Sequence, residues 1–381
     1  MILIRQATLY TPDAEGIKDV LVAGGQVVAV QDKIEIGKSL QVQEINGEGK
    51  LLVPGFLDAH VHIAGAGGEG GPQTRTPELP AWRLAEGGVT GVVGCLGTDG
   101  FTRNQESVLM QVKALKKRGF SAWMYAGAYQ VPTPTLLGDL GRDVALIEEV
   151  IGAGEIALSD HRSSTPTVDE LVRLAEHVRV GGMLGGKAGI VNIHLGDAQK
   201  PFAPLLAAAE KSELPLKQFF PTHINRNAHI FEEAKAYGKK SWVDITTSAY
   251  PFFPDIEVKP SLAVKKLLES DVPPEHITLT SDANGSLPDF DAQGNLLKLE
   301  IGWPKTILNE VRDMVLRENL PIPTALQTVT RNVAHILKLP QKGAIRTGAA
   351  ADLLLLGPDF QLEYVISNGQ LMMEEGKILI K

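Results

Sequence analysis

The 381-residue chain contains a single cysteine, Cys95, and this scarcity excludes an internal disulfide bond. A chain without disulfides suits a reducing compartment, so we expect a cytoplasmic protein. The opening residues, Met1 to Gln6, are too short and too polar a run for a signal peptide. The sequence also lacks the ~18 consecutive apolar residues of a transmembrane helix, so no membrane span is expected.

The sequence also has fewer basic residues than acidic residues. The formal net charge is −8, and no long run of Lys or Arg occurs. We therefore expect neither a nucleic-acid partner nor an anionic membrane surface. Hydrophobic residues make up 44% of the chain, which suits one large domain or one large domain plus a small one.

Both ends of the chain predict short strands separated by glycine turns. Gly24-Gly25 lies between two apolar runs, and Asn368-Gly369 lies between two more. Glycine and asparagine suit the positive φ of tight hairpin turns. We expect residues 1–53 and 341–381 to pair as one small β-sandwich domain, which would bring the termini together.

Residues 54–340 alternate apolar runs with helical patterns. Eight such repeats favour a closed parallel (β/α)8 barrel of the TIM type. A doubly wound open sheet is the alternative, but no glycine-rich dinucleotide fingerprint opens the first unit. The first expected strand includes 51–53 and ends at His60 and His62. The other expected strands are 89–94, 121–125, 155–158, 189–194, 217–221, 243–247 and 276–281. The expected helices are 77–87, 104–118, 142–151, 169–178, 202–211, 230–238 and 262–270.

Candidate metal ligands gather where these strands end. His60 and His62 are two residues apart, so their side chains leave the same face of a strand. A His-x-His pair alone fits two structural histidines equally well. Further candidates occur in or directly after later strands: Glu155, His194, His223 and Asp282. The carboxyl ends of barrel strands face one mouth, so these six side chains are expected to hold two divalent metals there. Nitrogen and carboxylate ligands without thiolate favour zinc, with manganese, cobalt and iron as alternatives.

The segment Pro54–His62 and the later strand-end residues together resemble the amidohydrolase superfamily. The resemblance covers nearly the whole chain and is closest to the isoaspartyl dipeptidase family. The segments that carry this narrower resemblance are Gly67–Pro72, Thr74–Glu78, Leu96–Asp99, Gly127–Tyr129, Ser159–Ser163, Pro221–Asn227 and Ser281–Ser286. It implies metal-dependent hydrolysis of β-aspartyl (isoaspartyl) dipeptides, which releases aspartate and a free amino acid. The expected partner is thus a small dipeptide, and we also expect a homo-oligomer.

The chain departs from this family in strand four. The family usually carries a carbamylated lysine there as the bridge between its metals, but 153–160 contains no lysine. Glu155 is the expected replacement, because a carboxylate is close to a carbamate in charge and shape. Its side chain reaches ~3–4 Å less far, and Gly154 would let the strand approach the metals. Two alternatives stay open: Glu155 is a strand-edge charge beside a single metal, or a lysine elsewhere, with Lys187 the first candidate, is carbamylated.

The resemblance also implies roles for the site residues. A metal-activated hydroxide attacks the side-chain amide, and Asp282 passes its proton to the leaving amine. Tyr129 polarises the carbonyl, and Arg162 and Arg226 bind carboxylates. Glu69 takes the substrate ammonium. The alternative for Tyr129 is a core ring with its hydroxyl satisfied, which its Gly-Ala-Tyr context makes the weaker interpretation. Without the resemblance, each arginine would more often be a solvated surface charge. The expected catalytic residues are Asp282, Tyr129 and Glu69, and the expected substrate-binding residues are Gly67, Gly68, Glu69, Thr98, Tyr129, Arg162, Arg226 and Ser286.

Other residues and functions remain in competition. The glycine-rich run Ala64–Gly71 lacks the Gly-Lys-Ser/Thr ending of a phosphate loop, so a substrate loop is expected. His161 is expected to support the site from behind its ligands. The remaining histidines are expected to be structural or exposed: His177, His229, His276 and His335. The alternative functions are a hydantoinase, dihydroorotase or N-acyl-amino-acid deacylase, which share the metal site, and a catalytically silent scaffold. The complete set of metal ligands argues against the scaffold.

Overall fold

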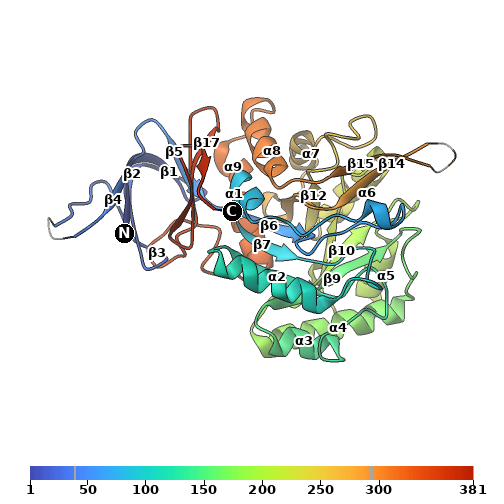
Figure 1. Ribbon diagram of the computed structural model, residues 1–381. Helices are drawn as coiled ribbons and strands as arrows, with labels where there is room; N and C mark the ends of the chain where they lie inside the picture. The colour runs from blue at the N-terminus through green and yellow to red at the C-terminus, as the bar shows by residue number, and fades with distance from the viewer. Residues whose placement is uncertain (38–39, 292, 294, 381) are drawn as a thin grey trace.

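The computed structural model describes residues 1–37, 40–291, 293 and 295–380, and eight parallel strands form its larger part (Figure 1). Six of them pair in the order β6-β7-β8-β9-β10-β11, and β12 pairs with β13. The backbone N–H of Ile224 donates to the Asp244 carbonyl at 3.3 Å, which links the end of β11 to β12. Val61 pairs in parallel with Ala283, so the chain beyond β13 returns to β6. The strands are Phe56–Val61, Val89–Gly94, Ser121–Ala126, Val150–Leu158, Ile190–Leu195, Phe219–Thr222, Val243–Thr246 and Ile277–Thr280.

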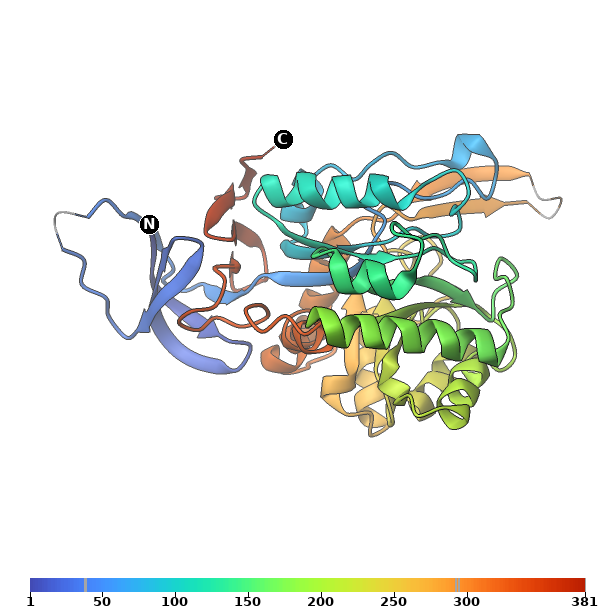
Figure 2. The same ribbon diagram turned by 90° about the horizontal axis from the view of Figure 1, so that it is seen from below.

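This curled parallel sheet agrees with the predicted barrel and excludes the open sheet. Helices cover its outside (Figure 2). α2 shows why: Asn104 accepts the N–H of Ser107 and begins the helix, and Val108, Val112 and Leu115 form a buried stripe against the strands. The helices are α1 Trp82–Glu86, α2 Gln105–Lys117, α3 Leu140–Leu146, α4 Val168–Gly185, α5 Ala203–Lys211, α6 Ala228–Gly238, α7 Pro260–Glu269, α8 Lys305–Leu316, α9 Ile322–Gln327 and α10 Arg331–Ile336.

Strands from both ends of the chain form a second, nine-stranded sheet (Figure 1). β5 joins the two ends, because it pairs in parallel with β1 and antiparallel with β16. The expected hairpins at Gly24-Gly25 and Asn368-Gly369 are present. The hydrogen bonding makes one sheet rather than two separately bonded sheets, and it has a core of its own that includes Ile4, Val20 and Leu355. Its strands are β1 Ile2–Tyr10, β2 Ala14–Ala23, β3 Gln26–Gln31, β4 Gln43–Asn46, β5 Leu51–Pro54, β16 Leu353–Leu356, β17 Leu362–Ser367, β18 Gln370–Glu374 and β19 Lys377–Ile378.

The structure corrects several of the predicted elements. The predicted helix 77–87 begins only at Trp82, and the helices α8, α9 and α10 beyond β13 were not predicted. Residues 51–53 belong to the nine-stranded sheet, so the first barrel strand begins at Phe56. The predicted helix 142–151 ends at Leu146, because the chain then enters the long strand β9 at Val150. The sequence analysis also missed a hairpin, β14 Ser286–Phe290 with β15 Leu296–Ile301, which projects from the barrel beyond β13 (Figure 2).

Within the part of the chain that the structure describes, no helix combines the length and the apolar character that crossing a bilayer requires.

Candidate metal and substrate site

A cavity of about 280 Å³ lies at the carboxyl ends of the barrel strands, and most of the predicted site residues line it. The predicted residues along its wall are His62, Gly67, Glu69, Thr98, Tyr129, Glu155, Arg162, His194, His223, Arg226, Asp282 and Ser286. Two predicted residues lie just behind the wall. His60 is fully buried beneath it, and Gly68 lies in the adjacent loop.

A backbone irregularity aims Glu155 into the barrel. The register between β9 and β10 shifts between Val191 and Ile193, because Ala153 pairs with the first and Ile156 with the second. Glu155 therefore lies in a bulged stretch, a device that redirects a side chain beside many active sites. Gly154 is required there, since a Cβ at this position would lie 2.8 Å from the Cβ of Asn192. The bulge offsets the shorter reach of glutamate that the sequence analysis identified.

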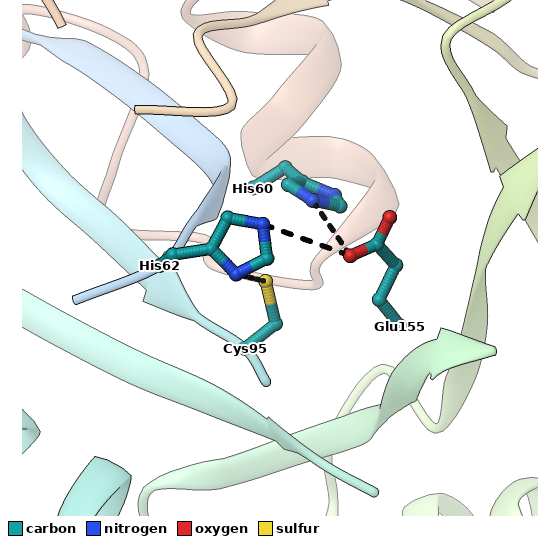
Figure 3. Close-up of side chains that lie close together, drawn as sticks. All are labelled: His60, His62, Cys95 and Glu155. Carbon is teal, nitrogen blue, oxygen red and sulfur yellow. Dashed lines mark hydrogen bonds and ion pairs between the residues drawn. The ribbon is translucent and has the colours of Figure 1, made fainter. Parts of the chain in front are cut away.

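Glu155 and the histidines of β6 form one candidate metal group (Figure 3). Glu155 Oε2 lies 3.3 Å from His60 Nε2 and 3.8 Å from His62 Nε2. Asp282 Oδ1 lies 3.0 Å from His62 Nε2 and 3.6 Å from His60 Nε2. Cys95 is the fourth member of the group, and its sulfur lies 3.8 Å from His62 Nδ1. The thiol lies beside Nδ1 of His62, whereas Asp282 lies beside Nε2. The spacing of residues along the sequence did not indicate that Cys95 lies here.

A second group shares the other oxygen of Glu155. Its members are Glu155, His194 and His223, and their donor atoms lie within 4.8 Å of one another. Glu155 Oε1 lies 2.5 Å from His194 Nδ1 and 3.2 Å from His223 Nε2. Burial alone would raise the pKa of the Glu155 carboxyl, but His60 and His194 hold it well below its usual range. Burial lowers the pKa of His223 to about 3, so its imidazole is neutral near pH 7, as a metal ligand must be.

The outer nitrogens of these histidines are held by neighbouring side chains. His60 Nδ1 lies 3.1 Å from Asn192 Oδ1, and His223 Nδ1 lies 2.6 Å from Thr246 Oγ1. Such partners fix the orientation of metal-binding imidazoles and leave the opposite nitrogen free. The sequence analysis assigned no role to Asn192 or Thr246, because their relation to the histidines exists only across strands.

These residues fit a divalent metal. Three buried atoms that face one another have no hydrogen-bond partner within the described residues: His60 Nε2, Glu155 Oε2 and Asp282 Oδ1. Leaving three buried polar atoms unpaired is costly, and a cation among them would satisfy all three at once. Nitrogen and oxygen donors of this kind suit zinc and its neighbours in the first transition row. Burial would raise the pKa of Asp282, but the His62 imidazole 3.0 Å away keeps that pKa below its usual value, so the ligand is ionised.

The cavity also holds an ordered cluster of charges. Thr98 donates to Glu69 at 2.8 Å, and Arg162 lies 3.4 Å from the same carboxylate. Arg162 is held in turn by Asp160, with its Nη2 2.8 Å from Oδ2, and Arg226 lies 3.7 Å from that oxygen. Burial opposes the ionisation of Asp160, yet Arg162 and His194 hold the pKa of its carboxyl far below the usual range. Asp160 thus positions both guanidinium groups, a role that the sequence analysis did not assign.

Tyr129 and the glycine-rich loop complete the wall. The Tyr129 hydroxyl lies 2.7 Å from His194 Nδ1, and Arg162 lies over its ring. Gly67 has φ +79°, and a Cβ there would lie 2.2 Å from the Thr74 carbonyl oxygen, so only glycine fits. Ser286 donates to that carbonyl at 3.2 Å, which anchors the base of the β14–β15 hairpin to the loop.

The positions of three further residues bear on expectations from the sequence. His161 is exposed and does not line the cavity, so it gives the ligands no support. Lys187 donates to the Val150 carbonyl at 3.0 Å, at the beginning of β9 and therefore at the opposite end of the barrel, so it is no candidate for a carbamylated bridge. His276 is structural as expected, because it is buried with Nδ1 2.7 Å from the Gly238 carbonyl oxygen.

Known proteins with this fold share much of the sequence. The model of the amidohydrolase family matches residues 207–372. The crystal structure of a beta-aspartyl dipeptidase from Fervidobacterium islandicum AW-1 in complex with beta-Asp-Leu dipeptide is 38% identical over 99% of this chain and 98% of its own, with a TM-score of 0.91. A second structure of beta-aspartyl dipeptidase from that organism is 36% identical, covers 99% and 98% of the two chains, and has a TM-score of 0.89. A dihydroorotase of Acetivibrio thermocellus is 23% identical over 96% of this chain and 90% of its own. The chain belongs to the amidohydrolase family of enzymes and, within it, to the beta-aspartyl dipeptidase family.

Proposed function

We propose that this protein hydrolyses β-aspartyl dipeptides to aspartate and a free amino acid. The main support for this proposal is the arrangement of charged side chains in one cavity. Arg162, Arg226 and Glu69 lie in the same cavity as the candidate metal ligands. A β-aspartyl dipeptide carries two carboxylates and one ammonium, so these three side chains match its charges. The similarity to beta-aspartyl dipeptidases, one of them in complex with beta-Asp-Leu, supports the same substrate class.

The metals would be held by His60, His62, Glu155, His194, His223 and Asp282, and we propose two ions, with zinc favoured by the donor set. Bound divalent cations supply Lewis acidity, which activates water and polarises a carbonyl oxygen. Glu155 faces both ligand groups with separate oxygens, which is the geometry a bridging carboxylate needs.

The remaining chemistry belongs to the side chains. Asp282 lies at the bottom of the cavity, ionised, and accepts the proton that attack on the amide releases, then returns it to the leaving amine. The Tyr129 hydroxyl donates to the carbonyl oxygen as negative charge develops there. Arg226 binds the carboxylate of the leaving residue, because Asp160 approaches it only to 3.7 Å and leaves donors free. Glu69, in the glycine-rich loop, binds the substrate ammonium.

The test is a panel of substrates with purified, metal-loaded protein. β-Asp-Leu should be cleaved. Hydantoin, dihydroorotate and N-acetyl-leucine should be cleaved at least ~100-fold more slowly, because each lacks one or more of the charges that the three cavity side chains pair with. α-Asp-Leu should also be cleaved at least ~100-fold more slowly, because its three charges are placed differently around the scissile amide. Cleavage of dihydroorotate or hydantoin above that of β-Asp-Leu would contradict the proposal. Absence of all five activities, together with absence of bound metal after purification from metal-supplemented medium, would favour the silent scaffold.

A further inference from the structure

One carboxylate in the cavity has no role in the chemistry just described. Glu257 lines the cavity from the loop between β12 and α7. Its Oε2 is buried without a hydrogen-bond partner, and the described residues offer its side chain no hydrogen bond or ion pair. Burial raises the pKa of Glu257 to about 8, which Arg226 opposes and Asp282 reinforces. A buried carboxyl group without a counter-charge is costly, so its presence in a binding cavity calls for a ligand group.

The backbone fixes Glu257 rather than leaving it on a loose loop. Its N–H donates to the Phe253 carbonyl at 3.0 Å, which closes a helical turn. The next residue, Val258, donates to the carbonyl of Asn225 at 2.9 Å. Glu257 is thereby tied to the segment that carries Arg226, and both residues line the same cavity.

The surroundings of Glu257 suit an aliphatic chain. Ala249, Phe253 and Ile256 line the cavity on its own loop, and Leu287 and Pro288 line it from the β14–β15 hairpin. An aliphatic stem gains free energy by leaving water for such a wall, whereas a charged end requires a partner. The wall and the carboxylate together match a side chain that has a long apolar stem and a positive end.

We propose that Glu257 selects β-aspartyl dipeptides whose second residue is lysine or arginine. This inference rests on the proposed function, because it places the carboxylate of that residue on Arg226. The Cα that bears this carboxylate also bears the side chain, which therefore begins beside Arg226 and extends along the apolar wall towards Glu257. With the Arg226 charge neutralised by the substrate carboxylate, Glu257 is the available partner for the cationic end.

The test compares β-Asp-Lys with β-Asp-norleucine, which has the same four-carbon stem without the charge. Wild-type protein should show a kcat/KM about tenfold or more higher for β-Asp-Lys, equivalent to ~1.4 kcal/mol. Glu257→Gln should reduce that ratio to below about threefold while changing kcat/KM for β-Asp-norleucine by less than about threefold. Cleavage of the norleucine substrate also shows that the variant is folded and metal-loaded.

Asp255→Asn is the matched control, because Asp255 is an exposed carboxylate of the same loop that does not line the cavity. It should leave the lysine preference unchanged. A wild-type ratio near one, or an equal loss of both activities in Glu257→Gln, would overturn the inference and leave the proposed function standing. Failure to cleave any β-aspartyl dipeptide would overturn both.

Discussion

Glu155 Oε2 lies 3.3 Å from His60 Nε2, and neither atom has a hydrogen-bond partner within the described residues. This position agrees with the expectation from the amidohydrolase resemblance that Glu155 replaces a carbamylated lysine, and such a replacement would need no carbon dioxide. A carbamate forms from a neutral amine and dissolved CO2, and a glutamate side chain requires neither.

The first prediction follows directly. Metal-stripped protein that is reloaded with zinc in bicarbonate-free, CO2-purged buffer should recover full activity, because the bridging group is already part of the chain. The measurement is the cleavage rate of β-Asp-Leu after reloading with and without added bicarbonate. A requirement for bicarbonate would show that a lysine is carbamylated and that Glu155 is no bridge.

Glu155→Gln tests the charge of the bridge. The amide keeps the shape but removes the negative charge that two cations share, so bound metal should fall from about two equivalents per chain to about one. Elemental analysis of the dialysed protein measures this without reference to activity. Glu149→Gln, just ahead of β9 and paired with Lys116, is the matched control and should retain both metals. Full metal content in Glu155→Gln would contradict the bridging role.

Asp282→Asn tests proton transfer. We expect kcat to fall about 10²–10⁴-fold or more, because the amide cannot accept the proton and is also a weaker ligand. Metal analysis and steady-state kinetics on the same preparation separate the two effects. Turnover close to wild type in a metal-loaded Asp282→Asn protein would assign the base to another residue.

Arg226→Met tests the carboxylate subsite. The loss of a charge-assisted pair, typically ~1.5–3 kcal/mol, should raise KM for β-Asp-Leu about 10–150-fold. Amidated β-Asp-leucinamide has no carboxylate at that end, so the variant should handle it about as well as wild type. The same loss for both substrates would mean that Arg226 supports the fold of the site through Asp160 and binds no carboxylate.

How far the sequence predicts this site depends on where each residue lies. His60, His194 and Asp282 were identifiable because each lies at the end of an apolar run, and barrel strands bring their ends to one mouth. Cys95 contacts His62 from the end of the neighbouring strand β7, and Asn192 contacts His60 from β10, which is not adjacent to β6 in the sheet. No spacing along the chain encodes either relation. The bulge at Gly154 is likewise a property of strand pairing.

The loops and the β-rich ends were predicted less well for a different reason. A short apolar run such as 51–53 fits either sheet, and only its pairing with β1 and β16 decides between them. The β14–β15 hairpin has two strands of ordinary β pattern, but its position follows from the anchoring of Ser286 to Thr74. Glu257 carried no recognisable motif, because its significance lies in a buried carboxyl group that has no hydrogen-bond partner within the cavity.

The contacts that close the barrel, between β6 and the segment after β13, affect both the folding of the protein and the lifetime of its native state. Asn284 donates to the His62 carbonyl across 222 positions of sequence, beside the Val61–Ala283 bridge. Contacts that close so long a loop carry a high entropic cost and depend on everything folded between them. His60, His62 and Asp282 lie on the two sides of that junction, so a cation held by them would add its binding free energy to the work of opening it. Loss of the metal and the first opening of the barrel at this junction should therefore occur together. Chelators should then shorten the lifetime of the native state as well as end catalysis.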